Sequence, residues 1–392
     1  MLTPKLLNTA LENSAIPIPK FAATGISDVT FGGFLCDKYI NSQPNATTSE
    51  GSPDVAHSGA VGSVMSKSKK GVPVWDYITF PQAMIACANR GKGWHLITAF
   101  EWASMALLAK ELSGGNTVSW PGGNNKNVDP PCDAITTAET ATLDAHLHGE
   151  SGTNHRALPG TGHINWAHNH MRNGVWDLNG LVNEWNMGLF LGVSGTYGHP
   201  EVLGSLDVTY RGSPYGRGTI SSSGGNPPVL TVDGAGVNWL KNWTPDAFNG
   251  MRIYIAEAAS GAGAFYSITD TTATTLLLTN GDAPGNGTAT FVICKHVATS
   301  IVNISNFSKI LTLRNTDANL KPFALPATVD ATGATAYGND DYYYPFSGSP
   351  LVAALRGGSF LAGGDAGVFF LALYDAPSIS YYGIGFRACK AL

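Results

Sequence analysis

The segment from residue 355 to residue 387 constrains the fold more than any other part of the sequence. It reads LRGGSFLAGGDAGVFFLALYDAPSISYYGIGFR and has arginine and glycine at both ends. Glycine lets one backbone approach another closely, and an arginine that is buried needs internal acceptors. We expect both arginines to anchor to such acceptors, with Glu184 as the candidate partner of one, rather than to cover the surface. The expected scaffold residues are Glu184, Trp185, Arg356, Gly357, Gly358 and Arg387.

Apolar side chains alternate inside this segment as they do in a strand. In AGVFFLALYD, one set consists of Phe369, Leu371 and Leu373. Because successive side chains of a strand point to opposite faces, we expect this set to be buried and the other set to be displayed. The turn at 376–377 then leads to SISYYG, which continues the displayed face. The residues expected on display are Leu361, Ala362, Asp365, Phe370, Ala372, Tyr374, Asp375, Ile379, Tyr381, Tyr382 and Gly383.

The composition favours a globular protein without nucleic-acid partners. Hydrophobic residues make up 43% of the 392 residues, which is ample for a core, and charged residues make up 13% with a net charge of -5. No basic patch for nucleic acid or for an anionic membrane follows from these values, and the lysines at 67–70 are read as a solvated loop. We find no signal peptide and no apolar run that could span a bilayer, so no membrane insertion is expected.

The five cysteines are widely spaced and never form a CxxC pair. An odd number with this spacing argues against a disulfide framework and against a thiolate zinc site. The cysteines therefore suggest neither structural cross-links nor a metal centre.

Two helices and one buried strand are predicted before residue 192. Thr79 can cap the first helix, and Thr98 with Glu101 forms a T-x-x-E capping box at the start of the second. Farther on, 173–191 reads as a tight turn at Asn179 and Gly180 that leads into a buried strand.

The composition changes near residue 212. Five short strand patterns follow at intervals of roughly a dozen residues, namely VLTV, MRIYIA, AFYSITD, TTLLLT and ATFVIC. They predict a small all-β module at 212–297, and domain insertion at a surface loop costs little free energy. We therefore expect one domain formed by 1–211 and 298–392, with the module inserted into it.

Several segments resemble a known family. PVWDYITFPQAMIACANRGKGWHLITAFEWASMALLA, VWDLNGLVNEW, LRGGSF and IGFRACKAL are similar, in order, to hallmark segments of the formylglycine-generating-enzyme type of C-type lectin fold. The similarity covers about 75–110, 173–190 and 355–392. It implies an α+β fold of that type, interrupted by the small β module.

The same resemblance argues against catalysis. In the oxidases of this family the active cysteines lie between the RGGS and GFR motifs, but 357–386 contains no cysteine and Cys389 lies beyond them. A second enzyme branch uses iron held by histidines, usually with an additional helical domain, and no such domain is recognisable. We therefore expect no enzyme and no cofactor.

A third branch matches the C-terminal segment better. It resembles the variable region of proteins diversified by diversity-generating retroelements, in which template adenines are randomised, mostly at AAY codons. Such changes cannot create Lys, Glu, Gln, Met or Trp. These types account for 41 of the 392 residues but are absent from 357–383, where about three are expected.

The resemblance implies a function in ligand recognition. The diversified C-terminal site would bind varied targets, namely protein or glycan ligands on a host or cell surface, and the protein would lie on a virion or a cell surface. A homo-oligomer would add avidity. The alternatives are a catalytic member of the fold that acts on a peptide thiol, and a structural virion protein.

Metal sites are weaker candidates. The pairs His146/His148 and His168/His170 could bind a metal on strands, but they lack a matched carboxylate pattern, and we read them as loop histidines. A structural calcium could use 339–341, or Asp177 with Asn179, although acidic loop residues more often form turns.

Overall fold

The computed structural model describes residues 15–46, 61–114, 121–145, 154–193, 198–222, 227–232, 239–257, 263–279, 285–301, 308–330, 342–345 and 351–392. In these ranges β-strands dominate, and the α-helices are α2 (Phe80–Ala88) and α3 (Ala99–Leu112). Three short 3-10 helices also occur, η1 (Ile164–Trp166), η2 (Lys321–Phe323) and η3 (Gly363–Asp365). Within the described residues, no helix has the length and apolar character needed to cross a membrane.

The predicted α+β C-type lectin arrangement is wrong. The described chain is mostly β, it has only the two short α-helices, and part of its largest sheet closes into a six-stranded barrel. The prediction rested on the resemblance of a few segments, and the one at about 75–110 contains both helices with their capping boxes. Most strands instead depend on partners far away in the chain, and their local signals are weaker.

Both predicted helices begin where the sequence indicated. Thr79 Oγ1 accepts a hydrogen bond from Gln82 N at 3.4 Å, and Gln82 Oε1 accepts one from Thr79 N at 2.9 Å. Thr98 and Glu101 form the same reciprocal pair at 3.0 and 2.9 Å. Each box satisfies two backbone donors that a helix N-terminus leaves unpaired, so both starts are defined locally.

A long sheet organises the molecule. Its strand order is β10-β11-β12-β9-β8-β13-β7-β6-β17-β18-β16-β14-β15, and β19 pairs with β6. The strands outside the barrel are β6 (Asn183–Leu191), β7 (Glu201–Leu203), β14 (Ser308–Leu313), β15 (Pro326–Asp330), β16 (Tyr342–Pro345), β17 (Val352–Gly357), β18 (Gly367–Leu373) and β19 (Ile384–Phe386). The predicted buried strand after Gly180 is confirmed as β6, which is buried along its whole length.

Two smaller sheets complete the described structure. The order of the first is β1-β2-β20-β5, which places the C-terminal strand between strands from the first hundred residues. The second pairs β3 with β4. Their bounds are β1 (Ala15–Ile18), β2 (Phe34–Asp37), β3 (Asn41–Ser42), β4 (Lys67–Ser68), β5 (Trp94–Leu96) and β20 (Ala388–Lys390).

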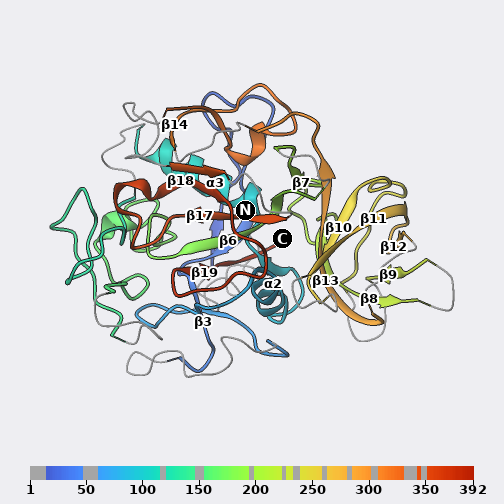
Figure 1. Ribbon diagram of the computed structural model, residues 1–392, viewed down its shortest axis with the longest axis horizontal. Helices are drawn as coiled ribbons and strands as arrows, with labels where there is room; N and C mark the ends of the chain where they lie inside the picture. Colours follow the sequence, from blue (N-terminus) through green and yellow to red (C-terminus); the bar gives the residue numbers. More distant parts are fainter. Residues whose placement is uncertain are drawn as a thin grey trace.

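The barrel closes because β10 pairs with both β11 and β13. Figure 1 shows it on the right, beside the other strands of the sheet. Its strands are β8 (Tyr215–Ser221), β9 (Val229–Thr231), β10 (Arg252–Ile255), β11 (Ala264–Thr271), β12 (Thr275–Leu278) and β13 (Gly287–His296). Five correspond to the predicted strand patterns, and β8 was not recognised in the sequence. That these residues form an inserted, autonomous domain stays a prediction.

The barrel shares part of its packing with the rest of the molecule. It has a core of its own, which includes Ile253, Leu276 and Phe291. Tyr254 instead belongs to the main core, where its ring lies 5.3 Å from the ring of Phe80 in α2. In addition, β13 continues past the barrel to pair with β7. The barrel is thus joined to the main core by packing as well as by a strand.

Candidate functional site

The C-terminal segment is attached at both ends to β6. At its start β17 pairs antiparallel with β6, with Arg356 opposite Glu184. At its end β19 pairs parallel with the same strand, with Gly385 opposite Glu184. Figure 1 shows β17 and β19 close to β6 in the centre of the molecule. Because both ends are fixed to one buried strand, the intervening chain starts and finishes at set positions.

Arg387 fixes the end of the segment through a buried ion pair. Its Nη2 lies 2.8 Å from Glu184 Oε1, and its Nε lies 3.1 Å from Glu184 Oε2. It also donates to the carbonyl oxygens of Asp37 and Trp176. Burial alone would lower the pKa of Arg387, but the Glu184 carboxylate raises it above its ordinary value. The prediction that Glu184 pairs with one of the two arginines is confirmed by this contact.

Arg356 fixes the start of the segment through backbone carbonyls. Its Nη2 donates to Phe323 O at 2.7 Å, and its Nη1 donates to Phe369 O at 3.2 Å. The side chain is fully buried. Arg356 therefore joins β17, β18 and η2 through acceptors that every residue type carries.

The two glycines after Arg356 are required by their surroundings. Gly357 has φ +88° and lies at the irregularity in the β17–β18 pairing, where a Cβ would come 3.2 Å from the Trp102 ring. Gly358 has φ +76°, and a Cβ there would come 2.6 Å from the Ala366 Cβ. Both features agree with the close approach expected from the sequence. Trp185 supports the same region, because its Nε1 donates to Ile78 O at 3.0 Å.

A third buried arginine, Arg156, was not identified from the sequence. Its Nη1 donates to Tyr382 O and to Asp76 Oδ2, both at 2.7 Å, and its Nη2 lies 2.9 Å from Asp144 Oδ2. The hydrogen bond from Arg156 Nη1 to the Tyr382 carbonyl fixes the backbone of the displayed stretch at 374–382. The one available signal was an arginine between a histidine-rich loop and the apolar pair Ala157 and Leu158.

The structure displays only part of the predicted surface. Leu361 is 44% exposed and Ile379 is 40% exposed. Six further positions are partly buried: Ala362, Asp365, Tyr374, Asp375, Tyr381 and Tyr382.

The display predicted for Phe370 and Ala372 is wrong, because both are buried and belong to the main core. Strand β18 lies between β17 and β16, and α3 packs against it through Trp102, whose Nε1 donates to Val368 O. All seven residues of β18 are buried, so both faces of the strand are covered, and alternation did not separate an inner from an outer face. Gly383 is also buried, and its carbonyl accepts a hydrogen bond from Asn183 N.

Four tyrosines form what we call the tyrosine surface: Tyr77, Tyr374, Tyr381 and Tyr382. The ring of Tyr382 lies 6.1 Å from that of Tyr381 and 6.5 Å from that of Tyr77. The Tyr381 hydroxyl accepts a hydrogen bond from Asn183 Nδ2 at 3.1 Å, and its side chain also bonds to that of Tyr374. Tyr77 was missed because it precedes α2, almost 300 positions earlier in the chain, and no local pattern links the two places.

Asp375 lies at the edge of the tyrosine surface, two residues after β18 ends. Its carbonyl oxygen accepts from Ala353 N at 3.1 Å, which fixes its backbone. Its Oδ2 atom is buried and has no hydrogen-bond partner. Burial raises the pKa of this carboxyl to about 6.

The predicted metal positions do not come together in the part of the chain that the structure describes. His146, His148 and 339–341 lie outside it. His168 Nδ1 accepts from Val175 N at 2.8 Å, and burial lowers its pKa to about 4. Asp177 Oδ2 accepts from Gly160 N, whereas Asn179 Nδ2 donates to Pro121 O, so the two side chains have different partners. No group of three or more metal-ligating side chains occurs among the described residues.

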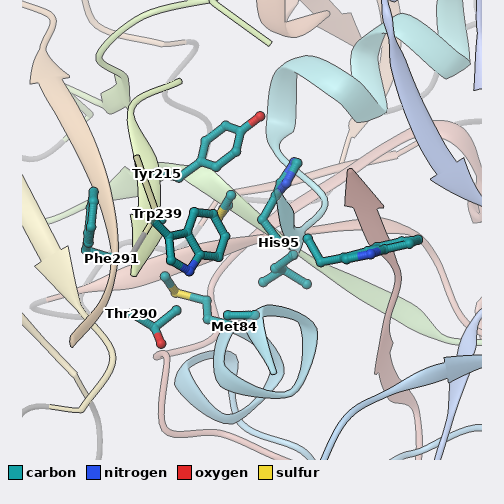
Figure 2. A pocket seen from close by; sticks show the side chains of 11 residues that line it. Met84, His95, Tyr215, Trp239, Thr290 and Phe291 are labelled. Carbon is teal, nitrogen blue, oxygen red and sulfur yellow. The ribbon is translucent and has the colours of Figure 1, made fainter. Parts of the chain in front are cut away.

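One small cavity lies where the barrel meets α2 and β5. It is lined by Met84 of α2, His95 of β5, Tyr215 of β8 and Phe291 of β13, among others. Figure 2 shows these side chains gathered from separate elements around one space. The free volume is only ≈ 10 Å³, about enough for a single water molecule. This cavity is a packing defect rather than a ligand site.

Comparisons with known proteins add little to this geometry. No protein-family model matches this chain, and neither does a curated protein. A solved structure titled "Major Tropism Determinant U1 Variant" is similar at a TM-score of 0.30 and 11% identity. The similarity covers 96% of this chain and 55% of that one, so this chain spans little more than half of its length. A TM-score this low does not establish a common fold, and the expected relation to formylglycine-generating enzymes has no support here.

Proposed function

We propose that this protein binds ligands through its C-terminal segment, which presents a variable set of side chains to targets on a cell surface. The proposed site consists of the loop at 361–365 and the stretch at 374–382, together with Tyr77. Strand β18 serves as support, because both of its faces are buried.

The observation that carries this proposal is the separation of anchors from displayed side chains. Arg356 binds backbone carbonyls, Arg387 binds Glu184 and two carbonyls, and Arg156 binds the Tyr382 carbonyl. Carbonyl oxygens accept hydrogen bonds whatever side chain the residue carries. Side chains such as Leu361 and Ile379 can therefore change while the backbone stays in place.

The chemistry of the surface is that of a protein-binding site. Tyrosine offers a large, rigid contact area with a polar tip and loses little conformational entropy on binding. Exposed Leu361 and Ile379 add apolar contacts at the two loops. Aromatic and apolar residues of this kind contribute most of the binding energy at protein interfaces.

We propose a binding protein rather than an enzyme. All five cysteine residues are buried. Burial raises the thiol pKa of Cys132, Cys294 and Cys389 above the ordinary value, which disfavours the reactive thiolate. Turnover of a cysteine-containing peptide to an aldehyde, above a buffer blank, would contradict this part of the proposal.

The diversification and the location are the finer parts of the proposal. The composition of 357–383 motivates variation by adenine changes, and a variable binding surface suits a virion or a cell surface. The test is the nucleotide sequence around the gene. We expect a reverse transcriptase and a near copy of the last hundred or so bases that differs only at adenines. Sister clones with identical sequences in this region would contradict diversification and favour a structural role.

Binding itself can be tested on intact cells. Labelled protein is incubated with a panel of microbial cells and bound fluorescence is measured by cytometry. We expect a double variant, Leu361→Asp with Ile379→Asp, to lose most of the binding, because both exposed contacts become charged. Met171→Asp is the matched control, since Met171 is 60% exposed outside the proposed site. Equal binding by parent, double variant and control would refute the site.

A further inference from the structure

Asp375 is fixed through its backbone, but its carboxylate oxygen Oδ2 has no hydrogen-bond partner among the residues that the structure describes. Its backbone is fixed by the hydrogen bond from Ala353 N, so its carboxylate has a set origin beside β17. One carboxylate oxygen, Oδ2, is buried and accepts no hydrogen bond. In the part of the chain that the structure describes, no lysine, arginine or histidine forms an ion pair with it.

Buried carboxylates in proteins normally have a hydrogen-bond donor or an opposite charge, because desolvation otherwise penalises the ionised form. Here that penalty is visible as a pKa raised to about 6 by burial. The ionised group is therefore poised near neutral pH and would gain free energy from any donor that reached it.

The neighbours of Asp375 are neutral aromatic groups. The side chains of Tyr374 and Tyr381 are hydrogen-bonded to each other, and Tyr381 also receives a hydrogen bond from Asn183. Burial and the Asp375 charge raise the pKa of Tyr381, so its phenol stays protonated. The faces of such rings attract cations, and a nearby carboxylate adds to that attraction.

The basic residues of this region are already engaged elsewhere. Arg156 pairs with Asp76 and Asp144, and Arg387 pairs with Glu184. Arg356 is directed to backbone carbonyls on the buried side. The guanidinium groups of this region thus serve as internal anchors. None of them forms an ion pair with the Asp375 carboxylate at the edge of the tyrosine surface.

We propose that Asp375, with Tyr374 and Tyr381, forms a subsite for a basic side chain, lysine or arginine, of a protein ligand. This inference rests on the proposed function and specifies what its surface recognises. A guanidinium or ammonium group would donate to the carboxylate and lie against the tyrosine rings. Leu361 and Ile379 are exposed in the same proposed site and favour a protein partner over a sugar, because they offer apolar contacts.

The test uses small probes on the intact protein. Arginine amide, lysine amide, glucosamine and the neutral citrulline amide are titrated in turn. Binding is followed by the carbon NMR signals of the Asp375 carboxyl and of the tyrosine rings. We expect both amino-acid cations to shift these signals and to lower the pKa of Asp375, and citrulline amide to leave them unchanged.

The variants Asp375→Asn and Asp330→Asn form a matched pair, because each removes one partly buried carboxylate, and Asp330 ends β15 outside the proposed site. We expect Asp375→Asn to weaken arginine amide binding by about tenfold or more, the factor for one charge-assisted hydrogen bond. Asp330→Asn should bind as the parent does. For Asp375→Asn, retained folding is checked by its unchanged tyrosine ring spectrum without probe.

Three outcomes would overturn the inference. They are equal shifts with citrulline amide, unchanged binding by Asp375→Asn, and no shift with either basic amide. Binding of glucosamine alone would show an amino-sugar site and would also refute a protein side chain. If cell binding still depends on Leu361 and Ile379 in any of these cases, the proposed function stands and only the basic subsite fails.

Discussion

The barrel and the C-terminal segment are both built of β-strands, but different contacts hold them in place. The barrel closes on itself through the β10–β13 pairing and is filled by apolar side chains such as Ile253, Leu276 and Phe291. The C-terminal segment lies in the open part of the sheet and is held by three buried arginines. The barrel is therefore held by its own apolar side chains. The C-terminal segment is held by buried arginines, so its outer side chains are not needed to keep its backbone in place.

The largest effect expected from this comparison concerns Arg387. Arg387→Ala leaves Glu184 buried without its counter-charge, so we expect a loss of about 3–5 kcal/mol in the free energy of unfolding. Denaturant titration measures it, with exposed Arg172→Ala as the control. Adding Glu184→Gln to Arg387→Ala should recover part of the loss, because the uncompensated charge is gone. No recovery would show that packing, not charge, makes this anchor essential.

Arg356→Ala should cost somewhat less, about 3 kcal/mol. The substitution removes the Arg356 donors to the carbonyl oxygens of Phe323 and Phe369, but it leaves no buried carboxylate without its counter-charge. Thermal and denaturant unfolding measure the change against the Arg387 variant. A variant that melts like the parent would mean that Arg356 is not an anchor and that the start of the segment is held by strand pairing alone.

A smaller loss in the free energy of unfolding is expected when one methylene is removed from the core of the barrel. Ile253→Val removes one fully buried methylene without exposing a polar group, so we expect a loss of about 1 kcal/mol. The loss should not change with salt concentration, because the substitution involves no charged group. A loss as large as that of Arg356→Ala would remove the contrast between the two regions.

The pH dependence of stability sharpens the comparison at Asp375. Its folded pKa of about 6 lies above the ordinary value of 3.8 for this carboxyl, so the folded state binds the proton more tightly. This group therefore adds stability below about pH 4 that is lost as pH rises through about 6. Asp375→Asn should reduce the pH dependence of the free energy of unfolding by less than about 1 kcal/mol, because solvent screens the charge of this partly exposed group. If the free energy of unfolding changes with pH in the same way in the parent and in Asp375→Asn, Asp375 does not have a raised pKa in the folded state.

The smallest effects should come from the displayed side chains. Leu361→Ser and Ile379→Ser should each change the free energy of unfolding by no more than about 0.5 kcal/mol, since both positions are exposed. Phe370→Ser is the contrasting variant, because the structure buries a position that the alternation placed outside. If Leu361→Ser unfolds the protein as readily as Phe370→Ser, the boundary between support and display is drawn in the wrong place.

Local patterns predicted the elements that local physics defines. The capping boxes at Thr79 and Thr98 marked both α-helices, since a capping side chain and its partner lie three residues apart. Five barrel strands were recognisable because alternating apolar residues and turn residues recur at short intervals. Strand β8 was missed because the glycines at 216 and 218 interrupt its pattern, although the barrel accepts them where β8 packs against β9 and β13.

The candidate site was predictable only in part. Leu361 lies between the glycine pairs at 357–358 and 363–364, and Ile379 follows the turn at 376–377, so their exposure could be expected from the chain itself. The burial of Phe370 and Ala372 could not, because it depends on what covers the faces of β18, and α3, which packs against this strand through Trp102, comes from a distant part of the sequence. Tyr77 and Arg156 were invisible for the same reason, since each joins the site only through contacts with 381–382.

The sequence by itself determined the helix starts, most barrel strands and the need for Gly357, Gly358, Arg356 and Arg387 at the ends of the segment. Those features follow from backbone conformation and from unpaired donors, which a residue carries wherever it lies. Only the tertiary structure decided which arginine meets Glu184, that the barrel closes, and that Asp375 Oδ2 accepts no hydrogen bond from the described residues. Each of these depends on distances between residues far apart in the chain, and those distances exist only after the strands have paired.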